Sequence, residues 1–211
     1  ELVVVVHDPL LAAAAPVLQP LADMARELAA AATSARQQRP LVLDNLARNL
    51  PAILSAPHAG ILRRICGGCP ALLVAPGPSL EHDLALLRRA SRPLLVALDT
   101  SLRALASAGV QPDLVVTLDP TRANLAKFTA QNPELPLVFF GSARPEPIGA
   151  ARHRFFACET GDLLDRAHAW FGREGRVTSQ GSVLLGALDL LLAAGAGPIA
   201  LIGVDLALKN R

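Results

Sequence analysis

The chain has 211 residues, a formal net charge of +2 and a hydrophobic fraction of 52%. This length is sufficient for a full hydrophobic core, and the near balance of charge, without a basic stripe, excludes a typical nucleic-acid-binding surface. The apolar runs are too short to cross a membrane, because even the longest, 184–196, contains Asp189 and a span needs about 20 apolar residues.

The first 37 residues are predicted to be the end of an N-terminal α/β unit. Leu2–Val6 is an apolar, β-branched run typical of a strand, and Ala12–Ala32 is an alanine-rich stretch typical of a helix. The chain starts at Glu1 in a strand pattern, with no initiator Met and no targeting segment. We therefore expect a piece of a longer cytoplasmic protein.

Residues 38–69 are predicted to form a helical connector. Gln37–Pro40 breaks the preceding helical pattern, and Asn45–Pro51 opens a short amphipathic helix. Cys66 and Cys69 are spaced as C-x-x-C, but no second Cys pair or close His pair accompanies them to complete a zinc site. A structural role is favoured for both cysteines.

From residue 70 onward, apolar strands alternate with helical segments. Strands are predicted at 71–75, 94–98, 114–118, 137–140, 154–157 and 199–202, and helices at 79–90, 101–108, 121–130 and 182–194. A Pro-rich loop is expected after residue 140, and a polar stretch through residue 175. This alternation predicts an α/β fold, a Rossmann-like, doubly wound and mostly parallel sheet with helices on both faces. The domain is expected to span 70–211 and to be truncated at its C-terminal side.

Polar residues follow the predicted strands, and ligands of such sheets bind outside the carboxyl ends of the strands. Gly77-Pro78-Ser79 joins the first strand to a helix start, a geometry that binds anions such as phosphate. An ordinary turn with Ser79 as N-cap is the alternative. Gly181-Ser182 is a second candidate helix start. The other candidates are Asp99, Thr100, Asp119, Pro120, Gly203 and Asp205.

Several well-known motifs are absent from the sequence. The turn at Gly77 has neither the G-x-G-x-x-G pattern of dinucleotide-binding proteins nor the G-x-x-x-x-G-K-[ST] pattern of a P-loop. Ser182 lacks the G-x-S-x-G spacing of a nucleophile elbow. The histidines belong to none of the strand-end motifs, and only His153 lies in a basic loop that could reach a ligand.

The ordered set of motifs resembles a known family over about residues 40–208. The motifs are Gly77-Pro78-Ser79-Leu80, Ala97-Leu98-Asp99-Thr100, Gly109-Val110-Gln111-Pro112-Asp113 with Val116-Thr117-Leu118-Asp119-Pro120, Gly181-Ser182-Val183, and Leu201-Ile202-Gly203-Val204-Asp205-Leu206. They resemble the central domain of the Maf (motility accessory factor) flagellin glycosyltransferases, grouped with archaeal MptE-like 6-hydroxymethylpterin pyrophosphokinases. Their order is also similar to that of bacterial sialyltransferases that use CMP-activated sugars. Asn45–Pro51 favours the Maf branch.

The resemblance implies a nucleotide-binding site. Gly77, Pro78 and Ser79 would lie under the nucleotide phosphate, and Gly181, Ser182, Gly203 and Asp205 would make further contacts. Asp99, Thr100, Asp119 and Pro120 would line the nucleoside or the donor sugar. The related sialyltransferases carry Asn at the positions of Asp99 and Asp119. Two carboxylates facing a phosphate need a cation or ribose hydroxyl groups to avoid repulsion, and a Mg²⁺ ion at Asp99 and Asp119 would meet this need.

The activity implied is transfer of a CMP-activated nonulosonic acid, of the pseudaminic or legionaminic type, to Ser or Thr of bacterial flagellin. Asp119 and Asp205 are the candidate catalytic residues. Sialyltransferase-like relatives use a His beyond the Gly-x-Asp motif as base, and the sequence up to Arg211 has no counterpart. The alternatives are ATP-dependent pyrophosphoryl transfer to 6-hydroxymethylpterin and a non-catalytic nucleotide-binding scaffold. With no Tyr and one Trp, few side chains could stack on a pterin, which favours the sugar.

Overall fold

The computed structural model describes residues 15–89, 92–121, 124–160, 176–179 and 181–205. The chain divides into two compact units, 1–44 and 45–211, and each is described by itself. The strand predicted at Leu2–Val6 lies outside the described residues. The bounds predicted for the N-terminal α/β unit therefore stay a prediction, whereas residues 45–69, predicted to be a connector, belong to the unit that contains the sheet.

One helix, α2, extends from Ala15 to Ser55 and contributes residues to both units. The helix break predicted at Gln37–Pro40 is wrong, because α2 continues through these residues. Proline in a helix interior removes one backbone hydrogen bond. The flanking residues include Ala, Arg, Gln and Leu, which have high helix propensity, and we infer that they sustain the helix across Pro40.

The second unit is built on a seven-stranded parallel sheet with the order β6-β5-β4-β3-β2-β1-β7. Its strands are β1 (Ala71–Val74), β2 (Leu94–Leu98), β3 (Leu114–Thr117), β4 (Leu137–Phe140), β5 (Arg154–Glu159), β6 (Arg176–Val177) and β7 (Ile199–Ile202). Next to the edge strand β7, Leu73 of β1 pairs with Val96 of β2 on one side and with Leu201 of β7 on the other. The parallel sheet predicted from the sequence is confirmed.

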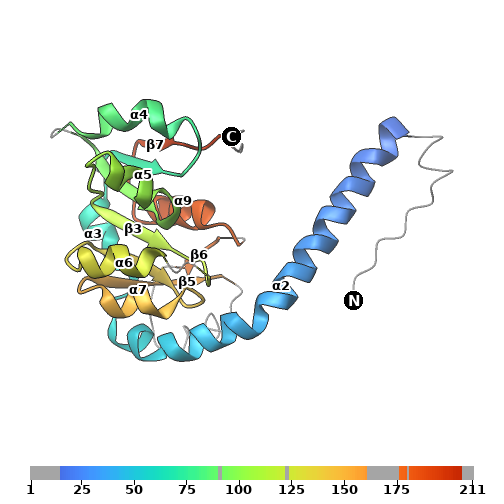
Figure 1. The fold of residues 1–211 in the computed structure, drawn as a ribbon, viewed down its shortest axis with the longest axis horizontal. Coiled ribbons are helices and arrows are strands. Elements are labelled where there is room, and N and C mark those ends of the chain that lie inside the picture. Colours follow the sequence, from blue (N-terminus) through green and yellow to red (C-terminus); the bar gives the residue numbers. More distant parts are fainter. Residues whose placement is uncertain (1–14, 90–91, 122–123, 161–175, 180, 206–211) are drawn as a thin grey trace. The chain divides into compact units, whose positions relative to one another are not determined.

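Helices cover both faces of the sheet. The helices of this unit are α3 (Arg63–Cys66), α4 (Leu80–Leu87), α5 (Leu102–Ser107), α6 (Asn124–Gln131), α7 (Pro145–Ala150) and α9 (Val183–Ala193), with 3-10 turns η1 (Ala59–Leu62) and η2 (Asp99–Ser101). The end of α2 packs on one face with α4, α5 and α7. The other face is covered by η1, α3 and α9. Figure 1 shows α4, α5, α6 and α7 following one another along the sheet.

This distribution follows from the path of the chain. From β1 to β6 each strand is added beside the previous one, so right-handed crossovers place α4 to α7 on the same face. The chain then returns through α9 on the opposite face and adds β7 beside β1. The Rossmann-like, doubly wound fold expected from the sequence is therefore confirmed.

Two elements differ from the sequence-based expectation. The Pro-rich loop expected after residue 140 contains α7, and Pro145 lies in the first turn of this helix. The N–H groups of the first turn have no partner within the helix, so the N–H that proline lacks removes no helical hydrogen bond. Ile148 of α7 is 1% exposed and fixes this helix on the core. Strand β6 has only two residues, too few for an alternating pattern to be recognised.

No helix in the described part of the chain has both the length and the apolar character that crossing a membrane requires.

Candidate functional site

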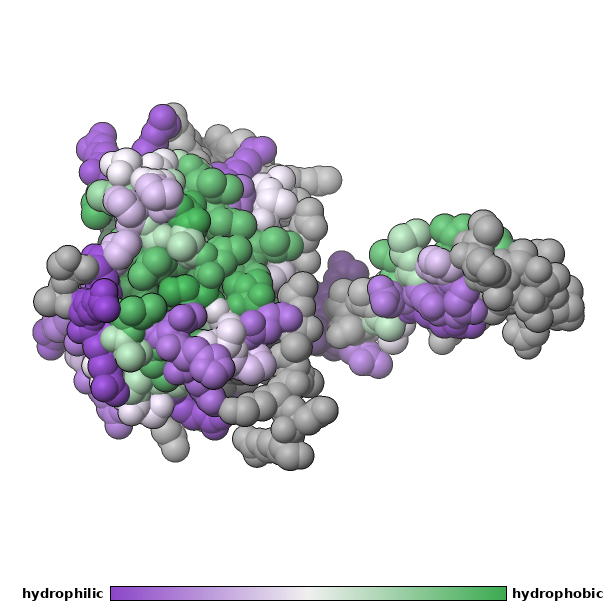
Figure 2. Space-filling view, turned by 90° about the horizontal axis from the view of Figure 1, so that it is seen from above, coloured by the Kyte–Doolittle hydropathy of each residue, from purple (hydrophilic) through white to green (hydrophobic). Residues whose placement is uncertain are grey.

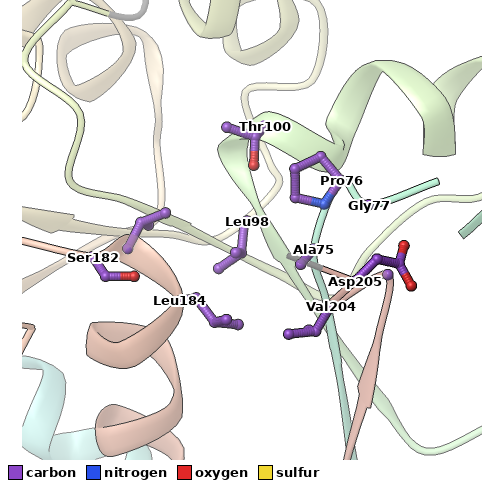
Figure 3. Close-up of a pocket in the computed structure, with 11 residues that line it drawn as sticks. Ala75, Pro76, Gly77, Leu98, Thr100, Ser182, Leu184, Val204 and Asp205 are labelled. Atoms are coloured by element: carbon purple, nitrogen blue, oxygen red, sulfur yellow. The ribbon is translucent and has the colours of Figure 1, made fainter. Parts of the chain in front are cut away.

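A pocket lies beside β1, where the strand order of the sheet reverses, because β2 to β6 are added on one side of β1 and β7 on the other. Ligands of open α/β sheets bind in the crevice at the carboxyl ends of the strands where the strand order reverses. The pocket in this crevice has a volume of about 520 Å³, within the range of about 300–1,000 Å³ that is typical of small-molecule sites. Its lining residues are Ala75, Pro76, Gly77, Leu98, Thr100, Ser182, Val183, Leu184, Gly203, Val204 and Asp205 (Figure 3).

Part of the predicted site residues meet in this pocket. The five that line it are Gly77, Thr100, Ser182, Gly203 and Asp205. Pro78 and Ser79 continue the turn after Gly77, whereas Asp99, Asp119, Pro120 and Gly181 are not among the lining residues. Sequence reasoning missed the apolar wall formed by residues such as Leu98, Leu184 and Val204. The available signal was that each stands directly beside a predicted polar motif.

Two glycines allow the ends of β1 and β7 to approach closely. The backbone N–H of Gly77 donates to the carbonyl oxygen of Gly203 over 2.7 Å, and a Cβ added to Gly77 would lie 2.4 Å from that oxygen. Gly203 has a φ of +70°, and a Cβ there would lie 2.2 Å from the carbonyl oxygen of Ala75. This close approach requires glycine at both positions, whether or not a ligand binds.

Asp205 caps the turn that was predicted to bind phosphate. Its Oδ2 accepts a hydrogen bond from the backbone N–H of Ser79 at 2.7 Å, beside the start of α4. The pKa of the Asp205 carboxyl is lowered, first by this backbone N–H, next by the Ser79 side chain and least by the charge of His82. The Ser79 hydroxyl makes no capping bond to α4. Phosphate contact at Gly77, Pro78 and Ser79 stays a prediction, and Asp205 already uses one donor of this turn.

The start of α9 supplies a second set of donors. Ser182 is the N-cap residue, and its Oγ accepts from the backbone N–H of Leu185 at 3.5 Å. The next two residues, Val183 and Leu184, line the pocket. The first N–H groups of a helix lack carbonyl partners within it and carry partial positive charge, so they favour an anion.

Thr100 places a hydroxyl between these two helix starts. Its Oγ1 is buried and has no hydrogen-bond partner among the residues that the structure describes. Figure 3 shows this oxygen pointing from above into the pocket, with Ser182 on one side and Asp205 on the other. A buried hydroxyl gains stabilisation when a ligand supplies its missing partner. Thr100 and Ser182 thus present polar groups to a mainly apolar pocket, whereas the carboxylate of Asp205, at its edge, is directed toward the Ser79 turn (Figure 3).

The two predicted metal ligands follow neighbouring strands. Asp99 is 8% exposed and accepts a hydrogen bond from Thr117 Oγ1 at 2.8 Å. Asp119 Oδ1 accepts from the backbone N–H and the hydroxyl of Thr121, at 2.7 and 2.6 Å, which closes a turn. Within the described residues, no three His, Cys, Asp or Glu side chains are grouped to hold a metal ion. Mg²⁺ commonly uses one or two carboxylates together with phosphate oxygens and water, and the Mg²⁺ ion expected at Asp99 and Asp119 stays a prediction.

His153 does not reach the pocket. Its carbonyl oxygen accepts from Leu137, the first residue of β4, and its ring contacts Glu134 at 3.1 Å. It therefore lies at the amino end of the sheet, opposite the pocket. Cys66 is buried and Cys69 exposed; burial, followed by the neighbouring Cys69, raises the pKa of the Cys66 thiol, which makes it a poor nucleophile.

The fold and the crevice define a Rossmann-like α/β protein with a pocket at the switch point of its sheet. The family model described as 6-hydroxymethylpterin diphosphokinase MptE-like matches residues 44–211. The chain belongs to this MptE-like family. No curated protein matches the chain.

A solved structure similar to this chain is that of the Maf glycosyltransferase from Magnetospirillum magneticum AMB-1. The two are 22% identical with a TM-score of 0.57, and the match covers 72% of this chain and 27% of that one. This likeness shows a shared fold. The chain thus spans about a quarter of that relative's length.

Proposed function

We propose that the pocket between β1 and β7 binds a nucleotide and that the chain is the nucleotide-binding part of a transferase. The observation that carries this proposal is that Thr100 and the start of α9 at Ser182 present polar groups to an apolar pocket at the switch point of the sheet, with Asp205 at its edge. Nucleotides need such a mixture, because the base is planar and largely apolar on its faces whereas the sugar and phosphate are polar. The family and the fold of the Maf relative support the same class.

In the proposed arrangement the nucleoside lies against Leu98, Leu184 and Val204. The phosphate takes the N–H groups at the start of α9 and the Thr100 hydroxyl, since neither carries a competing negative charge in the described residues. Asp205 is ionised and accepts hydrogen bonds from sugar hydroxyl groups. The turn Gly77-Pro78-Ser79 then orients Asp205 as well as bordering the nucleotide.

Asp99 and Asp119 are proposed to hold Mg²⁺ against the phosphate, which offsets the repulsion between like charges. Pro120 and Gly181 belong to the loops around the site and shape it without lining the pocket. No described residue is assigned as the catalytic base. Asp119 and Asp205 remain the candidates for a direct part in the chemistry.

The proposed reaction is transfer of a CMP-activated nonulosonic acid, of the pseudaminic or legionaminic type, to a Ser or Thr hydroxyl of flagellin. The hydroxyl oxygen forms a bond to the anomeric carbon, the bond from that carbon to the phosphate oxygen breaks, and CMP leaves with its electron pair. The hydroxyl proton passes to a base. Donors at helix starts stabilise the charge that develops on the leaving phosphate.

ATP-dependent diphosphate transfer to 6-hydroxymethylpterin is the second candidate, because the family carries the name of that activity. There the pterin hydroxyl attacks the β-phosphorus of ATP, and AMP is released. The described residues that line the pocket include no aromatic side chain. A pterin is commonly held by stacking, and the sugar nucleotide is therefore favoured.

Isothermal titration with CMP, CTP, ADP and ATP, each with and without Mg²⁺, tests the proposal. Preferred binding of the cytidine nucleotides supports the sugar transfer, preferred binding of ATP with Mg²⁺ supports the diphosphokinase, and binding of none of them contradicts both. A nucleotide that binds tightly but yields neither glycosylated flagellin nor pterin diphosphate would indicate a non-catalytic scaffold.

A pair of variants locates the binding. Leu184→Trp fills the pocket and is expected to abolish binding, because Leu184 lines it. Its matched control is Leu185→Trp, the next residue on α9, which is 42% exposed and does not line the pocket. Equal affinity of both variants would place the nucleotide elsewhere.

A further inference from the structure

Two asparagines on α2 contact loops at the carboxyl end of the sheet. Asn45 and Asn49 lie four residues apart, so their side chains share one face of the helix, and each is 2% exposed. Buried amides are stable only when their donors are satisfied. Both side chains here use the two N–H bonds of Nδ2 on backbone carbonyls.

Asn45 joins two different loops. Its Nδ2 donates to the carbonyl oxygen of Pro120, after β3, at 3.1 Å and to that of Ser142, after β4, at 3.0 Å. The amide is planar and its two N–H directions are fixed. It therefore sets the separation of the two carbonyls and with it the separation of the loops.

Asn49 fixes the second loop internally. Its Nδ2 donates to the carbonyl oxygens of Gly141 at 2.9 Å and Ala143 at 2.7 Å. These two carbonyls flank the residue that Asn45 contacts. The loop from Gly141 to Ala143 is thus held at three successive carbonyls by one face of α2.

The same two loops are also bonded to each other around Asp119. The carbonyl oxygen of Asp119 accepts from the backbone N–H of Arg144 at 3.3 Å, and its carboxylate accepts from Thr121. The Arg144 side chain donates to the Thr121 carbonyl oxygen at 3.4 Å. Together with the bond from Asn45 to Pro120, these contacts hold the two successive peptide units that follow Asp119.

The loops lack regular structure that would hold them otherwise. Residues 118–121 and 141–144 are outside the strands and helices, and Pro120 has no N–H to donate. Neither loop lines the pocket, so their connection to the candidate site is Asp119. A carbonyl facing solvent could take water as its partner, but water does not impose a distance between two loops. The paired amides therefore add a geometric constraint beyond satisfying hydrogen bonds.

We propose that Asn45 and Asn49 are positioning residues for the candidate site, because they hold the loops that carry Asp119 at a fixed separation. They touch neither nucleotide nor metal and act through the two loops. The inference rests on the proposed function for the role of Asp119, whereas the holding of the loops is a property that can be measured without a nucleotide.

The experiment compares Asn45→Ala with Leu46→Ala in the 211-residue chain. Leu46 is the next residue on α2, is 8% exposed and packs in the core, so its truncation lowers stability without removing a hydrogen bond to the loops. Amide hydrogen exchange of Thr121 and Arg144, followed by NMR, reports the bonds to Asp119. We expect exchange at least about tenfold faster in Asn45→Ala than in Leu46→Ala, compared under conditions of equal global stability. Equal exchange in both variants would overturn the proposal.

Titration of both variants with CTP and ATP in the presence of Mg²⁺ separates this inference from the proposed function. We expect the affinity of the nucleotide that the wild-type chain binds to fall about tenfold or more in Asn45→Ala, and to stay within about twofold in Leu46→Ala. Faster loop exchange with unchanged affinity would overturn the positioning role. Failure of the wild-type chain to bind either nucleotide would contradict the proposed function, and the exchange measurement would still decide whether the asparagines hold the loops.

Asn45→Ser provides a second variant should Asn45→Ala fold poorly. A serine hydroxyl retains one donor and loses the link between the loops. We expect its exchange and affinity to lie between those of the wild-type chain and Asn45→Ala. Wild-type values for both measurements in Asn45→Ser would contradict the need for a two-donor amide.

Discussion

The carboxylate of Asp205 accepts the backbone N–H of Ser79 over 2.7 Å, although 126 positions separate them in the sequence. This bond joins the loops that follow β7 and β1, the two strands at which the order of the sheet reverses. The carboxylate of Asp205 therefore already accepts the hydrogen bond from the Ser79 backbone N–H, which was predicted to bind phosphate. We take this relationship as the reason to place the nucleotide phosphate at the start of α9.

Asp205→Asn is expected to change the pH dependence of stability. The folded structure lowers the pKa of Asp205. The contribution of the ionised Asp205 to folding stability is therefore fully present above the pKa of an unfolded Asp, about 3.9. It is lost as the pH falls through the lower pKa of the folded state. In thermal melts between about pH 7 and pH 2.5, the difference in melting temperature between wild type and Asp205→Asn should become smaller as the pH falls.

A substitution at Ser79 tests the same hydrogen bond from the donor side, because replacing the side chain retains the backbone N–H that donates to Asp205. Ser79→Ala should keep most of the acid dependence, because the backbone N–H is the larger cause of the pKa shift and the side chain the smaller. A difference in melting temperature between wild type and Asp205→Asn that stays constant with pH would contradict the hydrogen bond from the Ser79 N–H to the Asp205 carboxylate.

Gly77→Ala is expected to destabilise the protein by about 2–3 kcal/mol, as overpacking does in well-packed sites. A Cβ at this position would meet the Asp205 carboxylate and the carbonyl oxygen of Gly203 at 2.3 and 2.4 Å, so the ends of β1 and β7 must separate. Denaturant unfolding measures the change. Gly149→Ala is the matched control, because no atom lies within 4 Å of a Cβ there and alanine favours its helix by about 0.5–1 kcal/mol. Similar losses in both variants would contradict the close approach.

Thr100→Val is expected to weaken nucleotide binding about tenfold with little loss of stability. The valine keeps the shape and removes a hydroxyl that has no partner among the described residues, and one ligand hydrogen bond contributes about 0.5–1.5 kcal/mol. Titration and thermal melts of the same variant measure both quantities. Thr117→Val, which removes the donor to Asp99, should instead lower stability by about 1–3 kcal/mol. Loss of stability in Thr100→Val with unchanged affinity would contradict its role in binding.

Asp113→Ala is expected to lower stability and to leave nucleotide affinity unchanged. The Asp113 carboxylate accepts from the Arg92 guanidinium and from the backbone N–H of Leu95 at 2.7 Å. Both contacts lie at the amino end of β2, opposite the pocket, so this motif residue has a structural role. Loss of these bonds should cost about 1–3 kcal/mol, measured by denaturant unfolding. A selective loss of affinity without loss of stability would show that the residue acts on the site.

The sequence alone predicted most of the sheet, for identifiable reasons. Strands such as β3 and β4 are buried at every position, so each appears as a short run of apolar and β-branched residues. The predictions that were wrong concern Pro40 and Pro145, where proline was taken to exclude a helix. In α2 the surrounding helix formers outweigh it, and in α7 its place in the first turn makes it harmless.

What the sequence determined by itself is the alternation of buried strands and helices, and the polar residues at the strand ends. These are local properties, since a strand's burial and a helix start are encoded within a few neighbouring residues. Only the tertiary structure decided which strand ends meet. Asp205 reaches Ser79 because β7 is added beside β1. Asn45 reaches Pro120 because the end of α2 packs on the sheet face that also carries α4, α5 and α7. Such contacts depend on strand order and crossover direction, which the spacing of motifs along the chain does not specify.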